Sequence, residues 1–148
     1  MALLRSLGAE HVLNSSDADF AAQLNAAVKT QHATFLLDAI GGAVTQQLSE
    51  AAPHGSTILL YSRLSLQDCI IDARTALSKH LHYEGWFLAN WLAGKNLIQT
   101  LLLSQRAQAL LGSDLATKVQ LRVPLAQAQE GLDAYVKDMT AGKVLLTC

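Results

Sequence analysis

Uninterrupted apolar runs alternate along this chain of 148 residues with segments whose apolar positions recur every three or four residues. The runs at 33–40 and 56–62 are typical of strands covered on both faces. Overall, the pattern predicts helices at residues 2–7, 15–30, 43–52, 73–80, 93–114 and 125–141, and strands at 10–14, 33–40, 56–62, 118–124 and 142–147. Residues 81–91 predict a strand that leads into a helix. Such alternation indicates an α/β fold with a mostly parallel sheet, in one domain over residues 1–148.

Helix boundaries are indicated by a few local signals. Gly8 is a typical helix end, and Pro53 with Gly55 closes the helix that precedes the second long apolar run. Three polar residues ahead of the segment 18–30 are candidate N-caps: Ser15, Ser16 and Asp17.

Composition excludes several classes of protein. A net charge of −1 with 16% charged residues argues against a nucleic-acid binder. No apolar run approaches the roughly 20 residues of a membrane span. The N-terminal segment has one basic residue, Arg5, and no cleavage-like tail, so we expect no signal peptide. Two distant cysteines, Cys69 and Cys148, form no disulfide framework, and the plain interpretation is a reduced, cytoplasmic protein.

Motifs that carry chemistry are few. Nine glycines occur and no two of them are spaced as G-x-G, so the usual turn that holds a pyrophosphate is not in this sequence. His80, His82 and Glu84 alternate as a metal clip on a strand would, but no cysteine cluster accompanies them. No nucleophile with a base and no carboxylate pair has the spacing of a hydrolase, so no catalytic residue is assigned.

Six segments, taken in order, resemble the C-terminal half of the medium-chain dehydrogenase/reductase family, in its quinone oxidoreductase and enoyl reductase branch. They are 3–20 (LLRSLGAEHVLNSSDADF), 35–42 (FLLDAIGG), 54–65 (HGSTILLYSRLS), 85–91 (GWFLANW), 123–136 (VPLAQAQEGLDAYV) and 140–146 (TAGKVLL). Each is weak alone, but their order and spacing over almost the whole chain are specific.

The resemblance implies a doubly wound, Rossmann-like sheet with strand order 3-2-1-4-5-6. Residues 11–14, 34–39, 57–62 and 85–88 would be its strands 3, 4, 5 and 6. Strands 1 and 2, the glycine-rich loop and the separate catalytic domain would then lie upstream of Met1. The family's zinc ligands would lie there too, so no metal ligand is assigned in this chain.

The family's cofactor is NADP or NAD, and the resemblance implies that this chain forms the nicotinamide side of its site. The implied cofactor-binding residues are Ala39, Ile40, Gly41, Tyr61, Ser62, Arg63, Trp86, Phe87, Leu88 and Lys143. Family members commonly have glycine where Ser62 stands. Structural alternatives remain open for each group: a simple glycine turn at 39–41, a purely structural role at 61–63, strand residues that fill a core at 86–88, and a solvated lysine at 143.

Without strands 1 and 2, residues 34–39 would form an unpaired, apolar edge strand of the sheet, which favours pairing with another chain. We therefore expect a homo-oligomer, a dimer through exposed sheet edges. Leucines in the segment 97–111 form a stripe of the kind that usually packs in a core, and that in the absence of a catalytic domain would instead recruit a second subunit.

Three functions remain open. The first is the cofactor-domain portion of an NAD(P)H-dependent quinone or enoyl reductase, not catalytic as this isolated chain. The second is a non-catalytic oligomeric remnant or interaction module. The third is a domain that binds another ligand in the same cleft, such as an acyl carrier or a small nucleotide.

Overall fold

The computed structural model describes residues 2–113, 115–139 and 142–148, with the side chains of residues 2 and 3 left undescribed. The chain divides into two compact units, one reaching to Trp91 and the other beginning at Leu92. Both units combine helices with parallel strands, so the predicted α/β class is confirmed. The ends of two predicted helices, at residues 114 and 140–141, lie outside the described residues.

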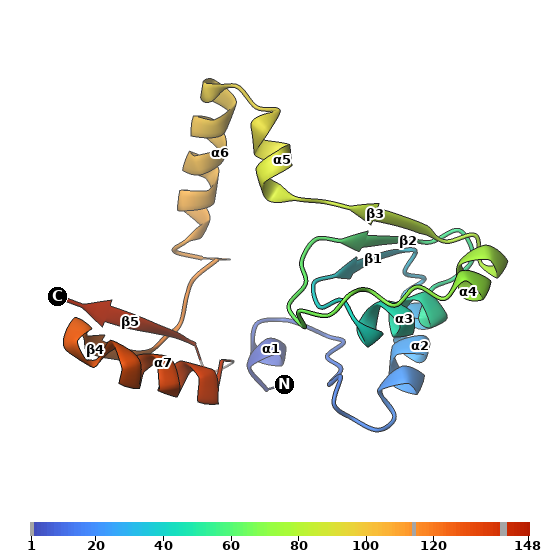
Figure 1. Cartoon of the computed structure of the whole chain (residues 1–148), viewed down its shortest axis with the longest axis horizontal. Coiled ribbons are helices and arrows are strands. Elements are labelled where there is room, and N and C mark those ends of the chain that lie inside the picture. The colour runs from blue at the N-terminus through green and yellow to red at the C-terminus, as the bar shows by residue number, and fades with distance from the viewer. Residues whose placement is uncertain (1, 114, 140–141) are drawn as a thin grey trace. The chain divides into compact units, whose positions relative to one another are not determined.

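The first unit is built on a three-stranded parallel sheet (Figure 1). Its elements are α1 (Ala2–Ser6), α2 (Phe20–Thr30), β1 (Phe35–Asp38), α3 (Ala43–Ala51), β2 (Thr57–Leu60), α4 (Ala73–Ser78) and β3 (His82–Gly85), followed by α5 (Leu88–Ala93), which crosses the unit boundary. The strand order is β1-β2-β3, with Asp38 opposite Leu60 and Leu60 opposite Gly85. This arrangement confirms the adjacency predicted for the family's strands 4, 5 and 6.

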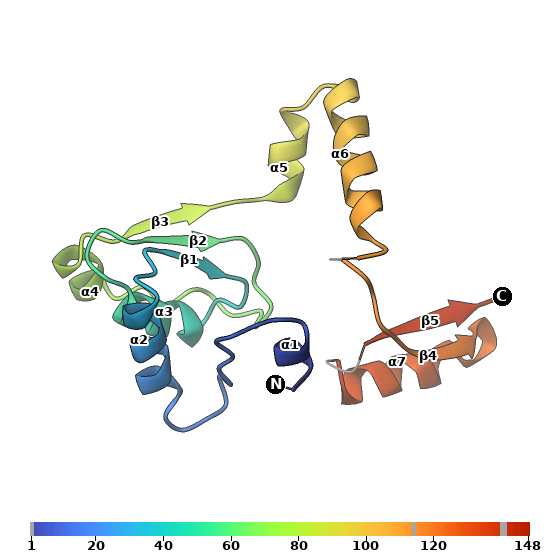
Figure 2. The same cartoon turned by 180° about the vertical axis from the view of Figure 1, so that it is seen from behind.

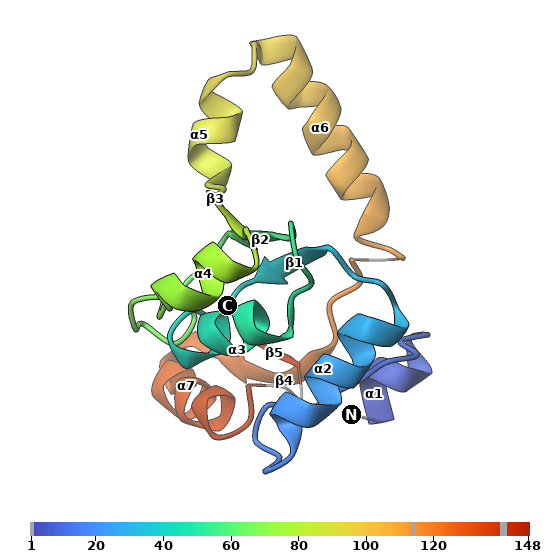
Figure 3. The same ribbon diagram turned by 90° about the vertical axis from the view of Figure 1, so that its right-hand side faces the viewer.

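Helices cover one face of this sheet. α2, α3 and α4 lie together on the same side, as the front and rear views show (Figures 1 and 2), and α2 packs beside α3 (Figure 3). Leu36 and Ile58 point to that side and are buried with Val28. On the other face Phe35 is 56% and Leu37 is 58% exposed. The prediction of strands covered on both faces is therefore wrong for β1, whose alternate side chains have no helix above them in the described chain.

The predicted strand at residues 10–14 is absent. Strand structure requires a hydrogen-bonded neighbour, and the described chain pairs no strand with the outer edge of β1. His11 instead lies with its Nε2 atom 2.8 Å from Nε2 of Gln31.

The strand predicted at residues 85–88 is displaced towards the N-terminus. β3 ends at Gly85 because its partner β2 ends at Leu60, the residue opposite Gly85. One more backbone bond, from Trp86 N to Leu60 O at 2.9 Å, closes the ladder, and Leu88 already begins α5.

The predicted N-caps of α2 are also wrong. Asn14 donates to the Asp17 carboxylate at 2.7 Å, and this contact belongs to a turn ahead of the helix. α2 begins at Phe20, with Asp19 at the N-cap position.

The second unit contains a two-stranded parallel sheet with a helix along it (Figures 1 and 2). Its elements are α6 (Leu97–Leu110), β4 (Val119–Pro124), the 3-10 helix η1 (Leu125–Gln127), α7 (Ala128–Lys137) and β5 (Lys143–Thr147). Gly131 lets α7 approach the sheet closely, since a Cβ at this position would lie 2.8 Å from Val123 Cγ2 and 3.1 Å from Val144 Cγ1.

α6 is a continuous helix of 14 residues (Figure 3). It begins with a capping box formed by Asn96 and Gln99. None of its residues is buried. Leu97, Leu101 and Leu102 are all more than half exposed, so the interpretation of this stripe as core is wrong.

Candidate functional site

The carboxyl ends of β1, β2 and β3 meet at one edge of the sheet, because the three strands are parallel and in register at Asp38, Leu60 and Gly85. Ligands of open α/β sheets bind at this edge. Nine of the ten predicted cofactor residues directly follow these strand ends, and the tenth, Lys143, belongs to the second unit.

Asp38 organises the turn that follows β1. Its side chain is 1% exposed, and its Oδ1 atom accepts hydrogen bonds from Ile40 N at 2.8 Å and Gly41 N at 2.9 Å. Its Oδ2 atom accepts a bond from Thr45 Oγ1 in α3 at 2.6 Å. The carboxylate thus joins the end of the strand, the turn and the helix.

The loop after β2 folds onto this turn. Backbone N–H groups of Tyr61, Leu64 and Ser65 donate to the carbonyls of Asp38, Ala39 and Ile40 at 3.2, 3.1 and 3.0 Å, respectively. The carbonyl groups of the turn are therefore already bonded within the protein.

Gly41 and Gly42 are buried beneath the same loop. Both have positive φ, at 75° and 60°. A Cβ on Gly41 would lie 3.3 Å from Gln67 O and 3.6 Å from Arg63 Cγ. Glycine is needed here for the left-handed conformation and for the close approach of the covering loop.

A cleft of about 620 Å³ lies between the ends of β2 and β3. It is lined by Leu60, Tyr61, Ser62, Arg63, Gly85, Trp86 and Phe87. Five predicted cofactor residues are thus brought together around one space, and the lining combines three aromatic side chains with one charged residue, Arg63.

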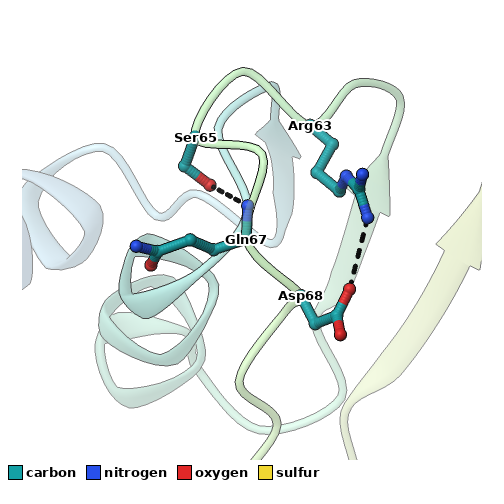
Figure 4. Close-up of polar contacts among 4 residues, drawn as sticks. All are labelled: Arg63, Ser65, Gln67 and Asp68. Atoms are coloured by element: carbon teal, nitrogen blue, oxygen red, sulfur yellow. Dashed lines mark hydrogen bonds and ion pairs between the residues drawn. The ribbon is translucent and has the colours of Figure 1, made fainter.

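Arg63 is paired within its own loop, as Figure 4 shows. Its Nη1 atom lies 3.3 Å from Oδ1 of Asp68, and the two side chains are 58% and 97% exposed. The loop reverses at Leu66, whose φ is 58°, and Gln67 N donates to Ser65 Oγ at 3.2 Å (Figure 4). The reversal carries Asp68 back to the guanidinium.

The remaining predicted site residues lie outside this lining. Ala39 and Ile40 form the neighbouring turn, and Leu88 is an exposed residue at the start of α5. Lys143 in the second unit donates from Nζ to Tyr135 Oη at 3.1 Å.

Sequence reasoning missed Asp38, Thr45 and Asp68. An acidic residue that ends a buried apolar run just before two glycines is a recognisable signal for the first, because aspartate commonly accepts bonds from backbone two residues ahead. The other two depend on how α3 and the loop fold back, and no local signal indicates them.

Histidine contacts occur at the other end of the strands. His54 stacks on His80 with ring centroids 5.9 Å apart, and His80 meets His82 edge-on at 5.3 Å. Across the described residues, no group of three or more His, Cys, Asp or Glu is positioned to hold a metal ion. Among the helices of the same residues, none has the length and apolar content of a membrane span.

Comparisons with known proteins agree with this architecture. The chain is 27% identical over 151 residues to the human mitochondrial enoyl-[acyl-carrier-protein] reductase, covering 97% of this chain and 39% of that protein. It is also similar to the solved structure of a protein described as an NADPH:quinone reductase from Mesorhizobium loti, with TM-score 0.79 and 26% identity over 99% of this chain and 42% of the other. No family model matches the chain.

A third similarity supports the fold. The 2-enoyl thioester reductase heterodimer Etr1p/Etr2p of Candida tropicalis matches with TM-score 0.68 and 20% identity over 99% of this chain and 43% of that chain. Etr1p has also been solved with NADP and crotonyl-CoA. The chain spans about two fifths of the length of each of these proteins.

The fold and the cleft at the strand ends are those of a Rossmann-like cofactor domain. Sequence and structural similarity over almost the whole chain confirm the resemblance to the medium-chain dehydrogenase/reductase family, in its quinone oxidoreductase and enoyl reductase branch.

Proposed function

We propose that this chain is the C-terminal cofactor-domain portion of an NADPH- or NADH-dependent reductase that acts on a quinone or an enoyl thioester. The observation that carries the proposal is the cleft at the carboxyl ends of β2 and β3, in a chain that resembles such reductases over 97% of its length. NADP is favoured over NAD, because the solved relatives include an NADP complex.

The residues of the cleft fit a nicotinamide ring. Trp86, Phe87 and Tyr61 offer aromatic surface to a planar group, and a ring bound against this aromatic wall would be shielded from water on one side. When bound, the cofactor supplies the hydride, and the protein positions it. The turn held by Asp38 would form the ribose-side wall, since the carboxylate fixes its backbone.

This sequence contains no G-x-G turn for the pyrophosphate, and its residue spacing assigns no catalytic residue. We therefore expect the isolated chain to be inactive as a reductase. The activity of the whole protein would need a catalytic domain and a phosphate-binding loop supplied by another segment or another chain.

A homo-oligomer is part of the proposal, with a dimer as its simplest form. β1 is the last strand of its sheet, and its exposed face carries Phe35 and Leu37. Unpaired strand edges of this kind pair with other chains. We propose a single domain and a cytoplasmic location for the chain.

The test is a titration of the purified chain with NADPH and NADH, followed by energy transfer from its two tryptophans to the nicotinamide, with the molecular mass measured on the same sample. Saturable binding that Trp86→Leu weakens and Trp86→Phe preserves is the expected result. No binding at millimolar dinucleotide would refute the proposal.

The exposed edge of β1 favours a second candidate, a non-catalytic interaction module. In that case the chain would be oligomeric and would bind no dinucleotide. A melting temperature raised by another ligand, but not by dinucleotides, would instead indicate a different occupant of the cleft.

A further inference from the structure

The cleft between β2 and β3 carries one charged side chain in its lining, that of Arg63. Three aromatic residues share the lining with it, so the cleft combines aromatic surface with a single cation. This combination suits a ligand that joins a planar ring to an anionic group.

Arg63 is placed by its backbone and its aliphatic stem. The next residue, Leu64, donates its N–H to Ala39 O at 3.1 Å, which fixes the loop against the turn after β1. The stem lies across Gly41, where a Cβ would come within 3.6 Å of Arg63 Cγ. Gly41 therefore leaves room for the arginine stem, and the guanidinium is left at the exposed end.

The ion pair with Asp68 is weakly held. Its 3.3 Å separation exceeds the usual 2.7–2.9 Å of a charge-assisted bond, a single nitrogen takes part, and Asp68 is 97% exposed. Pairs of this kind contribute little to stability, so an incoming anion displaces the carboxylate at small cost. A phosphate group, which accepts two parallel bonds from a guanidinium, is a better partner.

We propose that Arg63 is the anion anchor of this cleft: it binds a phosphate group of a ligand whose planar ring lies against the aromatic wall. In the absence of that ligand, Asp68 pairs with the guanidinium. The proposal rests on the proposed function for the identity of the ring. The phosphate belongs either to the dinucleotide or to a coenzyme A thioester, and the test separates these two sources.

The experiment compares dissociation constants of the wild-type chain and its variants for three probes: NADPH, crotonyl-CoA and inorganic pyrophosphate. Arg63→Gln is expected to weaken binding of the anchored probe about tenfold, because it removes the charge and the two-pronged donor. Arg63→Lys is expected to restore only part of the affinity. Asp68→Asn is expected to strengthen binding roughly threefold, since the competing carboxylate is lost.

Arg74→Gln is the matched control, because it removes an equal charge from exposed α4 at the opposite end of the sheet (Figure 1). Its affinities are expected to equal those of the wild type. Melting temperatures of all variants, measured first, should be unchanged, as Arg63 and Asp68 are exposed.

The source of the phosphate is the probe whose affinity changes in both variants: NADPH for a cofactor phosphate, crotonyl-CoA for a substrate phosphate. If the wild type, Arg63→Gln and Asp68→Asn bind NADPH equally well, and neither variant changes the affinity for the other probes, Arg63 is not an anion anchor. The proposed function would then still stand. Arg63-dependent binding of pyrophosphate or crotonyl-CoA without NADPH binding would support the anchor and refute the proposed function. No binding of any probe to the wild type would overturn both.

Discussion

The structure of the turn after β1 can be tested by substitutions of Asp38, whose carboxylate holds it. Asp38→Ala removes the acceptor for three donors, the N–H groups of Ile40 and Gly41 and the hydroxyl of Thr45. Hydrogen bonds to a charged acceptor contribute about 1.5–3 kcal/mol each, and they are not additive. Gly41 and Thr45 are buried, so their donors are left unpaired. We expect the free energy of unfolding to fall by about 3–5 kcal/mol, a large part of the stability of a small domain.

Thr45→Val tests the hydrogen bond from α3 to Asp38 separately from the two hydrogen bonds within the turn. The substitution keeps the shape, removes one donor and leaves Oδ2 of Asp38 unpaired, which is expected to cost about 1–3 kcal/mol. Asp38→Asn is the conservative control, because its amide oxygen still accepts from both turn N–H groups and its NH2 group donates to the threonine hydroxyl. We expect its cost to be about 1 kcal/mol.

Urea unfolding followed by circular dichroism measures these differences, with an unchanged m-value as the sign that the unfolded state is comparable. The double variant Asp38→Ala with Thr45→Val should cost less than the sum of the two single variants by about 1–2 kcal/mol. Strict additivity, or a cost below about 1 kcal/mol for Asp38→Ala, would refute this account of the turn.

Three other predictions concern separate parts of the chain. Gly131→Ala is expected to destabilise the second unit by about 1–3 kcal/mol in thermal unfolding, despite better helix propensity, because its Cβ would overlap the facing valine; a gain in stability would contradict the close packing. The hydrogen bonds that Asp72 accepts from the Thr75 side chain and backbone lower the pKa of its carboxyl from 3.8, so its stabilising effect is present above that value and is lost as pH falls through the lowered pKa. Asp72 is the N-cap residue of α4, and Asp72→Asn should make the melting temperature depend less on pH in the acid range. A melting temperature that falls with pH as steeply in the variant as in the wild type would argue against this role of the carboxylate. Leu66→Gly should stabilise by about 0.5–1 kcal/mol, because φ at this exposed residue is 58°, whereas Leu77→Gly in α4 should destabilise by about 1 kcal/mol; equal effects in chemical unfolding would deny the strain at Leu66.

The alternation of apolar runs with helical spacing was enough to predict the parallel sheet and most helices, because burial on average leaves a periodic pattern in the sequence. Strand limits were less predictable. β3 stops at Gly85 because its neighbour ends opposite it, and residues 10–14 form no strand because no neighbour is present in the described chain. Both outcomes depend on hydrogen-bond partners far away in sequence.

The candidate site, too, was predictable in part. The sequence by itself determined that residues after three buried strands would share one edge of a sheet, and it determined the glycine pair that the turn requires. Only the tertiary structure decided that the loop after β2 covers those glycines, that Arg63 stands at the margin of the cleft, and that Asp68 returns to pair with it. The physical reason is that periodicity encodes which side chains avoid water, whereas the partner of a buried carboxylate or an exposed guanidinium is fixed by the path of a loop in space.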